Sequence, residues 1–392
     1  MIIELLSSRK KRKYIIKWSL IFGILVGGPL VAIDSYHYGK VVIAPLNIVL
    51  YNVFSSHGAN LYGSEPWTFY FLNLGLNFNI ALIGSASALP VMVICRFLSN
   101  RKHLVTIHHW IVMASLLFWI ALFTVQKHKE ERFMFPIFPL ICLSAGISVE
   151  IGSKLISSYS LRLSNIYSNF IFILIALFAI LSISRGTALF KSFNAPFDVY
   201  MNLESVNDKI VASLGTSDGK MASDGKVTSD GEVASSNAQR LDGVINLCLG
   251  KEWHRYPSSF FLPDSERWKL RFLPSEFRGQ LPQPFVELPN GTRLIQDHFN
   301  DQNMEETSRY IESMEKCHFI IDTDYPTASG RDYPYSKHPG FKVISSSNFL
   351  DTAASRPIWR SFYVPFLSET KFWSFVNYNL LQNVNMTLHP NI

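Results

Sequence analysis

The densest group of charged side chains between apolar stretches is the run at positions 126–132, with the sequence QKHKEER. Cations in such a group can hold an anionic phosphate through charge-assisted hydrogen bonds, while carboxylates orient the cations or bind sugar hydroxyls. The alternative is a solvated hairpin loop whose charges only mark a membrane interface, and composition alone favours that alternative. Under the first interpretation the candidate site residues are His128, Lys129, Glu130, Glu131 and Arg132.

A second stretch of mixed chemistry, LYGSEPW at residues 61–67, precedes a long apolar segment. Its candidate site residues are Tyr62, Glu65 and Trp67, and asparagines follow inside the apolar segment at positions 73, 77 and 79. Carboxylates and amides suit the hydroxyls of a sugar, and an aromatic ring suits an apolar face of a ligand. Aromatic residues are equally common as membrane-interface anchors, so both interpretations stay open on the residues alone.

Both stretches adjoin segments that could cross a bilayer, which takes about 20 mostly apolar residues. There are five such segments, at residues 14–34, 68–95, 107–126, 133–150 and 167–184. The second contains the asparagines and Pro90, so it is either one kinked span or two half-spans that line a cavity. The sequence therefore predicts a polytopic α-helical membrane domain over residues 1–185.

The chain after residue 185 is polar, proline-rich and aromatic, which is typical of a folded globular domain. We expect a C-terminal mixed α/β domain at residues 186–392, interrupted by a flexible repeat insertion at about 215–236. That insertion repeats Ser-Asp-Gly with a period of six residues. It lacks the additional acidic ligands and the bidentate glutamate of a calcium loop, so a solvated insertion is the better interpretation.

The four cysteines show no CxxC pair and no metal-ligand spacing, so we infer neither a metal nor a cofactor. Cys95 and Cys142 lie in apolar segments, where a cysteine usually serves as a small apolar side chain. Cys248 and Cys317 share the C-terminal half. An oxidising compartment would permit a disulfide between them, but nothing in the sequence fixes their distance.

The basic residues set the orientation, because Lys and Arg concentrate on the cytosolic side of spans. The side that holds the N-terminus carries Arg9, Lys10, Lys11, Arg12, Lys13, Arg96, Arg101, Lys102, Lys154 and Arg162, and the other side carries Lys40, Lys127, Lys129 and Arg132. We therefore expect a cytosolic N-terminus and, after five crossings, a lumenal tail. The glycosylation sequons at Asn290 and Asn385 agree with a lumenal tail. Because the basic run at 9–13 directly precedes a span, we interpret it as a topology signal and expect no nucleic-acid partner.

Two stretches together resemble a known family: residues 61–79 (LYGSEPWTFYFLNLGLNFN) and 128–140 (HKEERFMFPIFPL). They are similar to the GT-C type glycosyltransferases that take mannose from dolichyl-phosphate mannose. That family includes mannosyltransferases of lipid-linked oligosaccharide and of glycosylphosphatidylinositol. The HKEERF run is shared across both kinds, so it indicates the family and not the member.

Segments of the tail resemble the α-1,2-mannosyltransferases of asparagine-linked glycosylation. The segments are GKEWHRYPSSFFLP at 250–263, FLPSEFRGQLPQPF at 272–285, NDQNMEETSRYI at 300–311, KCHFIID at 316–322 and SFYVPFLSE at 361–369. The resemblance implies a multi-pass protein of the endoplasmic-reticulum membrane. Its partners would be a dolichyl-phosphate mannose donor, a dolichyl-diphosphate oligosaccharide acceptor and the lipid bilayer.

The resemblance also implies a mechanism, in which an acceptor hydroxyl attacks a β-linked mannosyl phosphate and an α linkage results. His128, Lys129 and Arg132 would hold the phosphate, while Tyr62, Glu65 and Trp67 would position donor or acceptor. Glu130 and Glu131 would orient the cations or bind sugar hydroxyls.

The chain departs from the family at its N-terminus. Family members begin with further spans and a lumenal loop that bears an acidic pair, the expected general base. The surroundings of Asp34 do not resemble that motif, so the catalytic base is unassigned, and we expect an N-terminally truncated enzyme with little activity. The alternatives are a non-catalytic membrane protein that keeps an acceptor-binding tail, and a transporter, motivated by the polar residues within spans.

Overall fold

The structure is a computed structural model, and it describes most of the chain. The described residues are 9–51, 63–98, 102–218, 243–255, 258–284, 286, 288–294, 300, 302–326 and 331–386. Tyr62 and most of the repeat insertion therefore lie outside the described residues. Two compact units are present, one of residues 1–186 with 284–303 and the other of residues 187–283 with 304–392. Residues 284–303, which the sequence assigns to the C-terminal half, thus group with the first unit.

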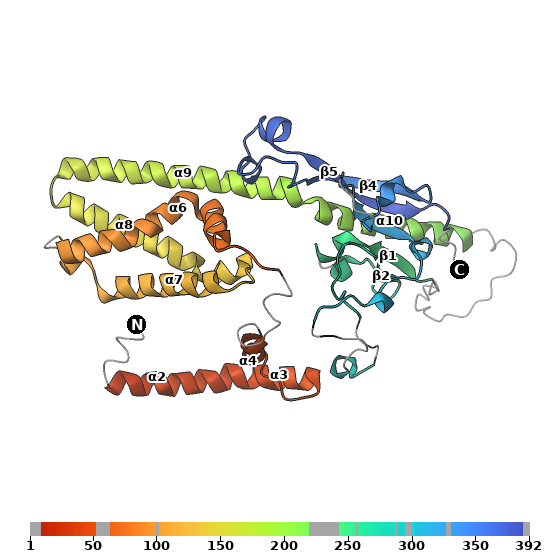
Figure 1. The fold of residues 1–392 in the computed structure, drawn as a ribbon, viewed down its shortest axis with the longest axis horizontal. Coiled ribbons are helices and arrows are strands. Elements are labelled where there is room, and N and C mark those ends of the chain that lie inside the picture. The colour runs from red at the N-terminus through yellow and green to blue at the C-terminus, as the bar shows by residue number, and fades with distance from the viewer. Residues whose placement is uncertain are drawn as a thin grey trace, which may run out of the picture. The chain divides into compact units, whose positions relative to one another are not determined.

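Helices make up the described part of the first unit (Figure 1). They are α2 (Arg9–Phe22), η1 (Gly23–Gly27), α3 (Gly28–Tyr38), α4 (Ala44–Val49), α6 (Phe69–Val93), η3 (Ile94–Leu98), η4 (Lys102–Leu104), α7 (Ile107–Val125), η5 (Glu131–Ile137), α8 (Phe138–Ser157), α9 (Leu161–Phe193) and η8 (Gly291–Arg293). Within the described residues, 5 helical segments are long and apolar enough to cross a membrane: Arg12–Tyr38, Phe69–Phe97, Ile107–Val125, Glu131–Ser157 and Leu161–Phe193. The described residues therefore contain helices of sufficient length and hydrophobicity at each of the five expected positions.

Helix α6 takes the form of one kinked span. Its backbone leaves helical geometry at Asn79, where φ is 37° and ψ is −112°. Asparagine tolerates a positive φ better than most residues, and here its side-chain oxygen accepts a hydrogen bond from the N–H of Ile80 at 2.6 Å. Helix α6 continues on both sides of the kink, so the single-span alternative describes it better than two half-spans.

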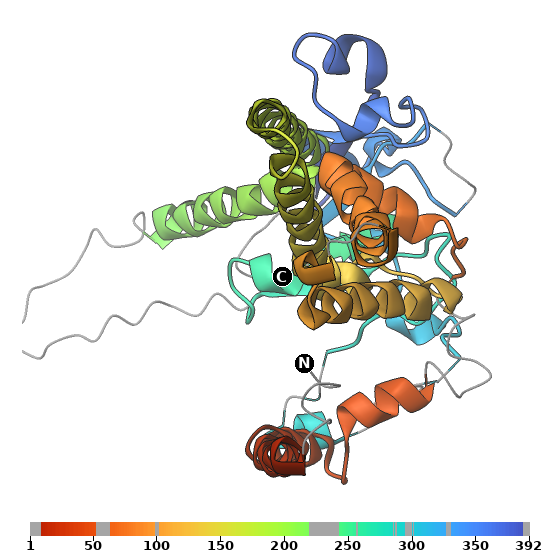
Figure 2. The ribbon, with the colours of Figure 1, turned by 90° about the vertical axis from the view of Figure 1, so that its left-hand side faces the viewer.

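Helices α6, α7 and α8 lie side by side in both views (Figures 1 and 2), and small residues bring α6 and α8 close together. A side chain added at Gly84 would meet the Cβ of Ala145 at 3.2 Å. Near this contact, the hydroxyls of Ser85 and Ser144 lie 2.5 Å apart. In a membrane, apolar helix surfaces gain little from leaving lipid for another helix. Close packing of small residues and hydrogen bonds between hydroxyls therefore hold helices together.

The second unit is built around a five-stranded sheet with the order β2-β1-β3-β5-β4. The strands are β1 (Ile245–Leu249), β2 (Trp268–Phe272), β3 (Phe319–Thr323), β4 (Phe341–Leu350) and β5 (Phe375–Asn383). Strand β1 runs parallel to β2 and β3, and β5 runs antiparallel to β3 and β4. Short helical turns connect the strands: η6 (Lys251–His254), η7 (Ser258–Phe261), η9 (Thr307–Arg309), η10 (Met314–Lys316), η11 (Tyr335–Lys337), η12 (Trp359–Ser361) and η13 (Ser368–Phe372).

One face of the sheet is covered by α10 (Ala195–Asp218). This helix buries apolar side chains at helical spacing, Val199, Leu203 and Ile210, against Phe319 and other residues of the central strands. All five residues of β3 are buried, as expected for a central strand covered on both faces. On the opposite face, Cys248 and Cys317 form a disulfide inside a second apolar cluster.

A buried polar network lies where β1 and β3 end. The amine of Lys251 contacts a carboxylate oxygen of Asp322 at 2.5 Å, and Asp322 is almost fully buried. Burial raises the pKa of Asp322 to about 6, although the neighbouring Lys251 works in the opposite direction. In the same region Glu252 pairs with Arg255, which also donates to the hydroxyl of Tyr325 at 3.1 Å. The first of the tail segments singled out in the sequence thus anchors the sheet.

Candidate active site

The charged run at 126–132 lies in the connection between α7 and α8. Helix α7 ends at Val125, and the backbone is extended at Gln126. The 3₁₀ turn η5 then leads into α8 from Glu131 onward. The indole N–H of Trp119 in α7 donates to the carbonyl of Phe133 at 2.9 Å and so ties this turn to α7. The loop is consequently held at both ends by membrane-length helices.

The structure brings together the two motifs that the sequence singles out. The N–H of Glu65 donates to the carbonyl of Lys127 at 3.0 Å. In return, the amine of Lys129 donates to the carbonyl of Glu65 at 3.0 Å. The segment that leads into α6 and the charged loop therefore form one structural element, although more than 60 positions separate them in the sequence.

Lys129 differs from its expected role as a phosphate ligand. Only 6% of its surface is exposed, and its amine also donates to the carbonyl of Gln126. Both acceptors are uncharged carbonyl oxygens of the backbone. A buried ammonium group needs such hydrogen bonds to offset the loss of water. Lys129 therefore holds the loop in place, and only the exposed cations of the loop are accessible to a ligand.

We expect Lys129→Met to destabilise the loop, because the substitution fills the same space and leaves two carbonyls without a donor. Each unsatisfied buried acceptor costs about 1–3 kcal/mol. Trypsin should therefore cut the variant faster near Lys127, and tryptophan fluorescence should report a lower unfolding temperature in nanodiscs. Lys127→Arg, which keeps a trypsin site at an exposed position of the same loop, is the matched control. Equal trypsin resistance of the two variants would contradict the role of Lys129 in holding the loop.

Glu130 connects His128 and Arg132, the other two candidate phosphate ligands of the loop. One of its carboxylate oxygens lies 3.0 Å from Nε2 of His128, and the other forms a salt bridge with Nε of Arg132. Burial raises the pKa of Glu130, but the hydrogen bonds from His128 and Arg132 outweigh burial, and the pKa lies below its usual value. The carboxylate thus stays ionised at neutral pH and orients the side chains of both His128 and Arg132.

His128 lies between two acceptors. Its Nδ1 is 3.2 Å from the carbonyl oxygen of Gly63, and its Nε2 faces Glu130. Both ring nitrogens thus lie beside oxygen atoms, and the ring links the loop to the backbone of Gly63.

Arg132 is the most open of these cations, with 69% of its side chain exposed. Its Nε is held by Glu130, and its two terminal nitrogens make no hydrogen bond or ion pair among the described residues. The guanidinium lies 5.9 Å from the ring centre of Phe133. A planar fork that is fixed at one nitrogen and open at two others suits bidentate binding of a phosphate.

Glu131 contacts Asn77, one of the α6 asparagines. The side-chain amide of Asn77 donates to a carboxylate oxygen of Glu131 at 2.5 Å. Arg185 of α9 also interacts electrostatically with Glu131. Sequence reasoning missed Arg185, because it follows an apolar segment and resembles an ordinary flanking charge. Charged residues in membrane segments usually pair with an opposite charge, and this rule could have suggested a carboxylate partner for Arg185.

Glu65 and Trp67 remain exposed beside the loop. The indole of Trp67 is 66% exposed, and its ring stands edge-on to Phe71 at 5.8 Å between centres. An exposed indole at the start of a span serves either as an interface anchor or as a platform for a sugar ring, and the geometry permits both. Among the described residues no group of three His, Cys, Asp or Glu side chains is placed to hold a metal ion.

An apolar groove of about 720 Å³ lies between α6 and α7. Its end near the charged loop is formed by Phe71, Thr124 and Val125, the last of which directly precedes Gln126. The groove continues along both helices to Leu89 and Met113. The described part of the first unit thus combines a cationic loop with an adjoining apolar channel, an arrangement that suits an amphipathic ligand with an anionic head.

These features define a multi-span membrane protein with a polar site at one end of its helices. Residues 1–221 match the Alg9-like mannosyltransferase family. The chain belongs to this family, as the resemblance of its motifs predicts.

Curated relatives agree with this assignment. The chain is 41% identical over 388 residues to the alpha-1,2-mannosyltransferase ALG9 of Mus musculus, and 40% identical over 388 residues to that of Homo sapiens. Each match covers 97% of this chain and 59% of the relative, so the chain spans about three fifths of the length of these proteins. The GPI alpha-1,2-mannosyltransferase 3 of Danio rerio is 32% identical over 127 residues, which cover 32% of this chain and 21% of that protein. No solved structure matches the chain.

Proposed function

We propose that the protein transfers mannose from dolichyl-phosphate mannose, in α-1,2 linkage, to a dolichyl-diphosphate-linked oligosaccharide used for protein N-glycosylation. The observation that carries the proposal is the exposed guanidinium of Arg132, oriented by Glu130 at the end of an apolar groove. The family and the names of the relatives support the type of reaction.

The donor fits this arrangement in two parts. Its phosphate would meet the open nitrogens of Arg132, and the side chain of His128 is held nearby by the same carboxylate, that of Glu130. Its polyprenyl chain would lie in the groove between α6 and α7, whose lining is almost wholly apolar. Each methylene that such a groove shields from water contributes about 0.8 kcal/mol, although a chain that comes from lipid gains less.

In the reaction the acceptor hydroxyl oxygen bonds to C1 of mannose as the bond from C1 to the phosphate oxygen breaks. The electron pair of that bond leaves with dolichyl phosphate, and the hydroxyl proton passes to a base. Cations at the leaving phosphate stabilise the charge that develops there. Glu130 is already engaged by His128 and Arg132, so it serves as an orienting group and we do not assign it as the base.

The proposal is tested with the purified chain in liposomes that contain dolichyl-phosphate [³H]mannose and a dolichyl-diphosphate oligosaccharide acceptor. We expect a low level of radioactivity in the oligosaccharide, because no catalytic base is assigned, and its release by an α-1,2-specific mannosidase. Donor binding without any transfer would favour the alternative function, a non-catalytic membrane protein that retains substrate-binding surfaces. Transfer in another linkage would exclude the proposed specificity.

We further propose that the protein resides in the endoplasmic-reticulum membrane with its sheet-containing unit in the lumen. The basic N-terminus and the five candidate spans support this orientation. At the far end of the first candidate span, the guanidinium of Arg293 lies 4.1 Å from the ring centre of Tyr36 and its Nε donates to the Tyr36 carbonyl at 2.8 Å. The sequon at Asn290 is exposed and three residues from this contact.

Asn290 is therefore expected to carry a glycan in cells. Endoglycosidase treatment should increase the gel mobility of the wild-type protein, and Asn290→Gln should remove one such shift. In sealed microsomes, protease added outside should leave an epitope placed after Asn385 intact until detergent is added. Digestion of that epitope without detergent would contradict the lumenal orientation.

A further inference from the structure

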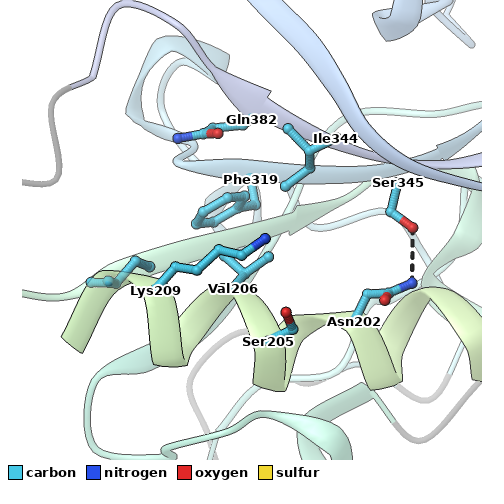
Figure 3. Close-up of a pocket in the computed structure, with 9 residues that line it drawn as sticks. Asn202, Ser205, Val206, Lys209, Phe319, Ile344, Ser345 and Gln382 are labelled. Atoms are coloured by element: carbon cyan, nitrogen blue, oxygen red, sulfur yellow. Dashed lines mark hydrogen bonds between the residues drawn. The ribbon is translucent and has the colours of Figure 1, made fainter. Parts of the chain in front are cut away.

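A second polar cavity lies within the unit that contains the sheet, between α10 and strands β3, β4 and β5 (Figure 3). Its volume is about 310 Å³, at the small end of the range for ligand pockets, which is roughly 300–1,000 Å³. The lining residues are Asn202, Ser205, Val206, Lys209, Ile210, Phe319, Ile344, Ser345 and Gln382. None of them belongs to the charged loop or to the segment that leads into α6.

The polar side chains of this cavity are available to a ligand. Within the described residues, the structure gives no hydrogen bond or ion pair to the side chains of Ser205, Lys209 and Gln382, and Figure 3 shows them on opposite walls. Asn202 donates to the hydroxyl of Ser345 at 2.8 Å, which leaves its side-chain oxygen open. Ser345 follows an irregularity in the pairing of β4 with β5, a feature that commonly redirects side chains beside sites.

The base of the cavity is apolar. Phe319 is fully buried beneath it, and Val206 of α10 is partly buried at its side. Ile344 of β4 is 37% exposed and offers an open aliphatic surface. The cavity thus combines uncharged hydrogen-bonding groups on its walls with an apolar surface. That combination is the chemistry of a pyranose ring, which carries hydroxyls around its edge and C–H groups on its faces.

We propose that this cavity binds one uncharged hexose unit of the oligosaccharide acceptor. The identification of the sugar as part of the acceptor rests on the proposed function, whereas the affinity for a hexose follows from the cavity alone. Of the described lining residues only Lys209 is charged, and its ammonium can donate to sugar hydroxyls. A phosphate would be expected to meet several cations, so the four neutral polar side chains favour a neutral polyol.

The test uses the full chain in nanodiscs and isothermal titration calorimetry with α-1,2-mannobiose. We expect saturable binding that weakens about tenfold in Lys209→Met and in Gln382→Ala, since each variant removes hydrogen-bonding groups that face the sugar. Lys371→Met is the matched control, because Lys371 is exposed in the same unit and does not line the cavity. Unfolding temperatures of all variants should match that of the wild type, because the substituted side chains make no hydrogen bond or ion pair among the described residues.

Three results would overturn the cavity proposal: no binding of mannobiose by the wild-type chain, unchanged binding in both cavity variants, or displacement of mannobiose by inorganic phosphate. The outcome is separable from that of the proposed function. If the chain binds mannobiose through Lys209 but never transfers mannose, the hexose site is supported and the proposed transfer reaction is contradicted. If the chain transfers mannose and Lys209→Met leaves the KM for the acceptor unchanged, the transfer reaction is supported and the acceptor site in this cavity is contradicted.

Discussion

Arg132→Ala is expected to lower mannosyl transfer by about 10²–10³-fold while the protein remains folded and inserted in the membrane. The guanidinium is 69% exposed and is oriented through its Nε by Glu130. Its terminal nitrogens can therefore donate hydrogen bonds to the leaving phosphate as negative charge develops there. Alanine removes that stabilisation without opening a cavity, since the side chain is not part of a core. The loss should therefore appear in the reaction and not in the unfolding temperature.

The kinetic pattern distinguishes stabilisation of the transition state from simple donor binding. If Arg132 acts mainly on the leaving group, kcat and kcat/KM for dolichyl-phosphate mannose should fall by similar factors. If it only holds the donor, KM should rise and kcat should survive at saturating donor. Arg132→Lys should recover part of the rate, because an ammonium supplies the charge without the planar fork.

Lys127→Ala provides the control for Arg132→Ala. Lys127 is an exposed cation of the same loop, and its backbone carbonyl, which the substitution preserves, is the part that pairs with Glu65. We expect its rate to stay within about threefold of wild type, as for most exposed substitutions. Near-normal transfer by Arg132→Ala, at limiting and at saturating donor, would mean that the loop only marks the membrane interface.

The membrane half was predictable because its signal is local. A run of about 20 apolar residues must be a helix in lipid, since every backbone group then pairs within the segment. The five predicted segments accordingly match the helical spans that the structure describes. The kink in α6 was anticipated as one of two alternatives from the polar residues in its segment, but its position at Asn79 depends on backbone geometry that composition does not specify.

The charged loop was predictable in composition but not in the roles of its members. From sequence, Lys129 and Arg132 are equivalent cations of one run. Their difference arises because backbone carbonyls of Gln126 and Glu65 converge on Lys129, and such a convergence involves a segment distant in sequence. The same reason explains why Arg185 was missed, since its interaction with Glu131 joins α9 to the loop.

The disulfide shows the same limit in the second unit. The sequence permitted a bond between Cys248 and Cys317 but left it open, because pairing requires the two Cα atoms to lie within about 7 Å. Strands β1 and β3 are neighbours in the sheet, and this arrangement brings the two Cα atoms to 5.8 Å. A parallel pairing between strands so distant in the chain cannot be derived from residue types alone.

Removal of this disulfide is expected to destabilise the sheet-containing unit by about 4 kcal/mol. The bond links positions 69 residues apart, so it removes much of the conformational freedom of the unfolded chain. Both sulfurs are fully buried in an apolar cluster, and for this reason the double variant Cys248→Ala/Cys317→Ala avoids leaving a reactive thiol there. For a unit of this size the loss corresponds to a decrease of about 10 °C in unfolding temperature.

The measurement is thermal unfolding of the full chain in nanodiscs, with and without a reducing agent. The reducing agent should lower the unfolding temperature of the wild type toward that of the double variant and should leave the double variant unchanged. Cys142→Ala is the control, because Cys142 is an exposed free cysteine of α8 and its loss should not alter the response. Since buried disulfides persist in oxidising compartments, wild-type protein from cells should already contain the bond if the unit is lumenal. Equal unfolding temperatures of wild type and double variant would show that the bond does not constrain the fold, and free thiols at both positions in protein from cells would contradict the lumenal placement.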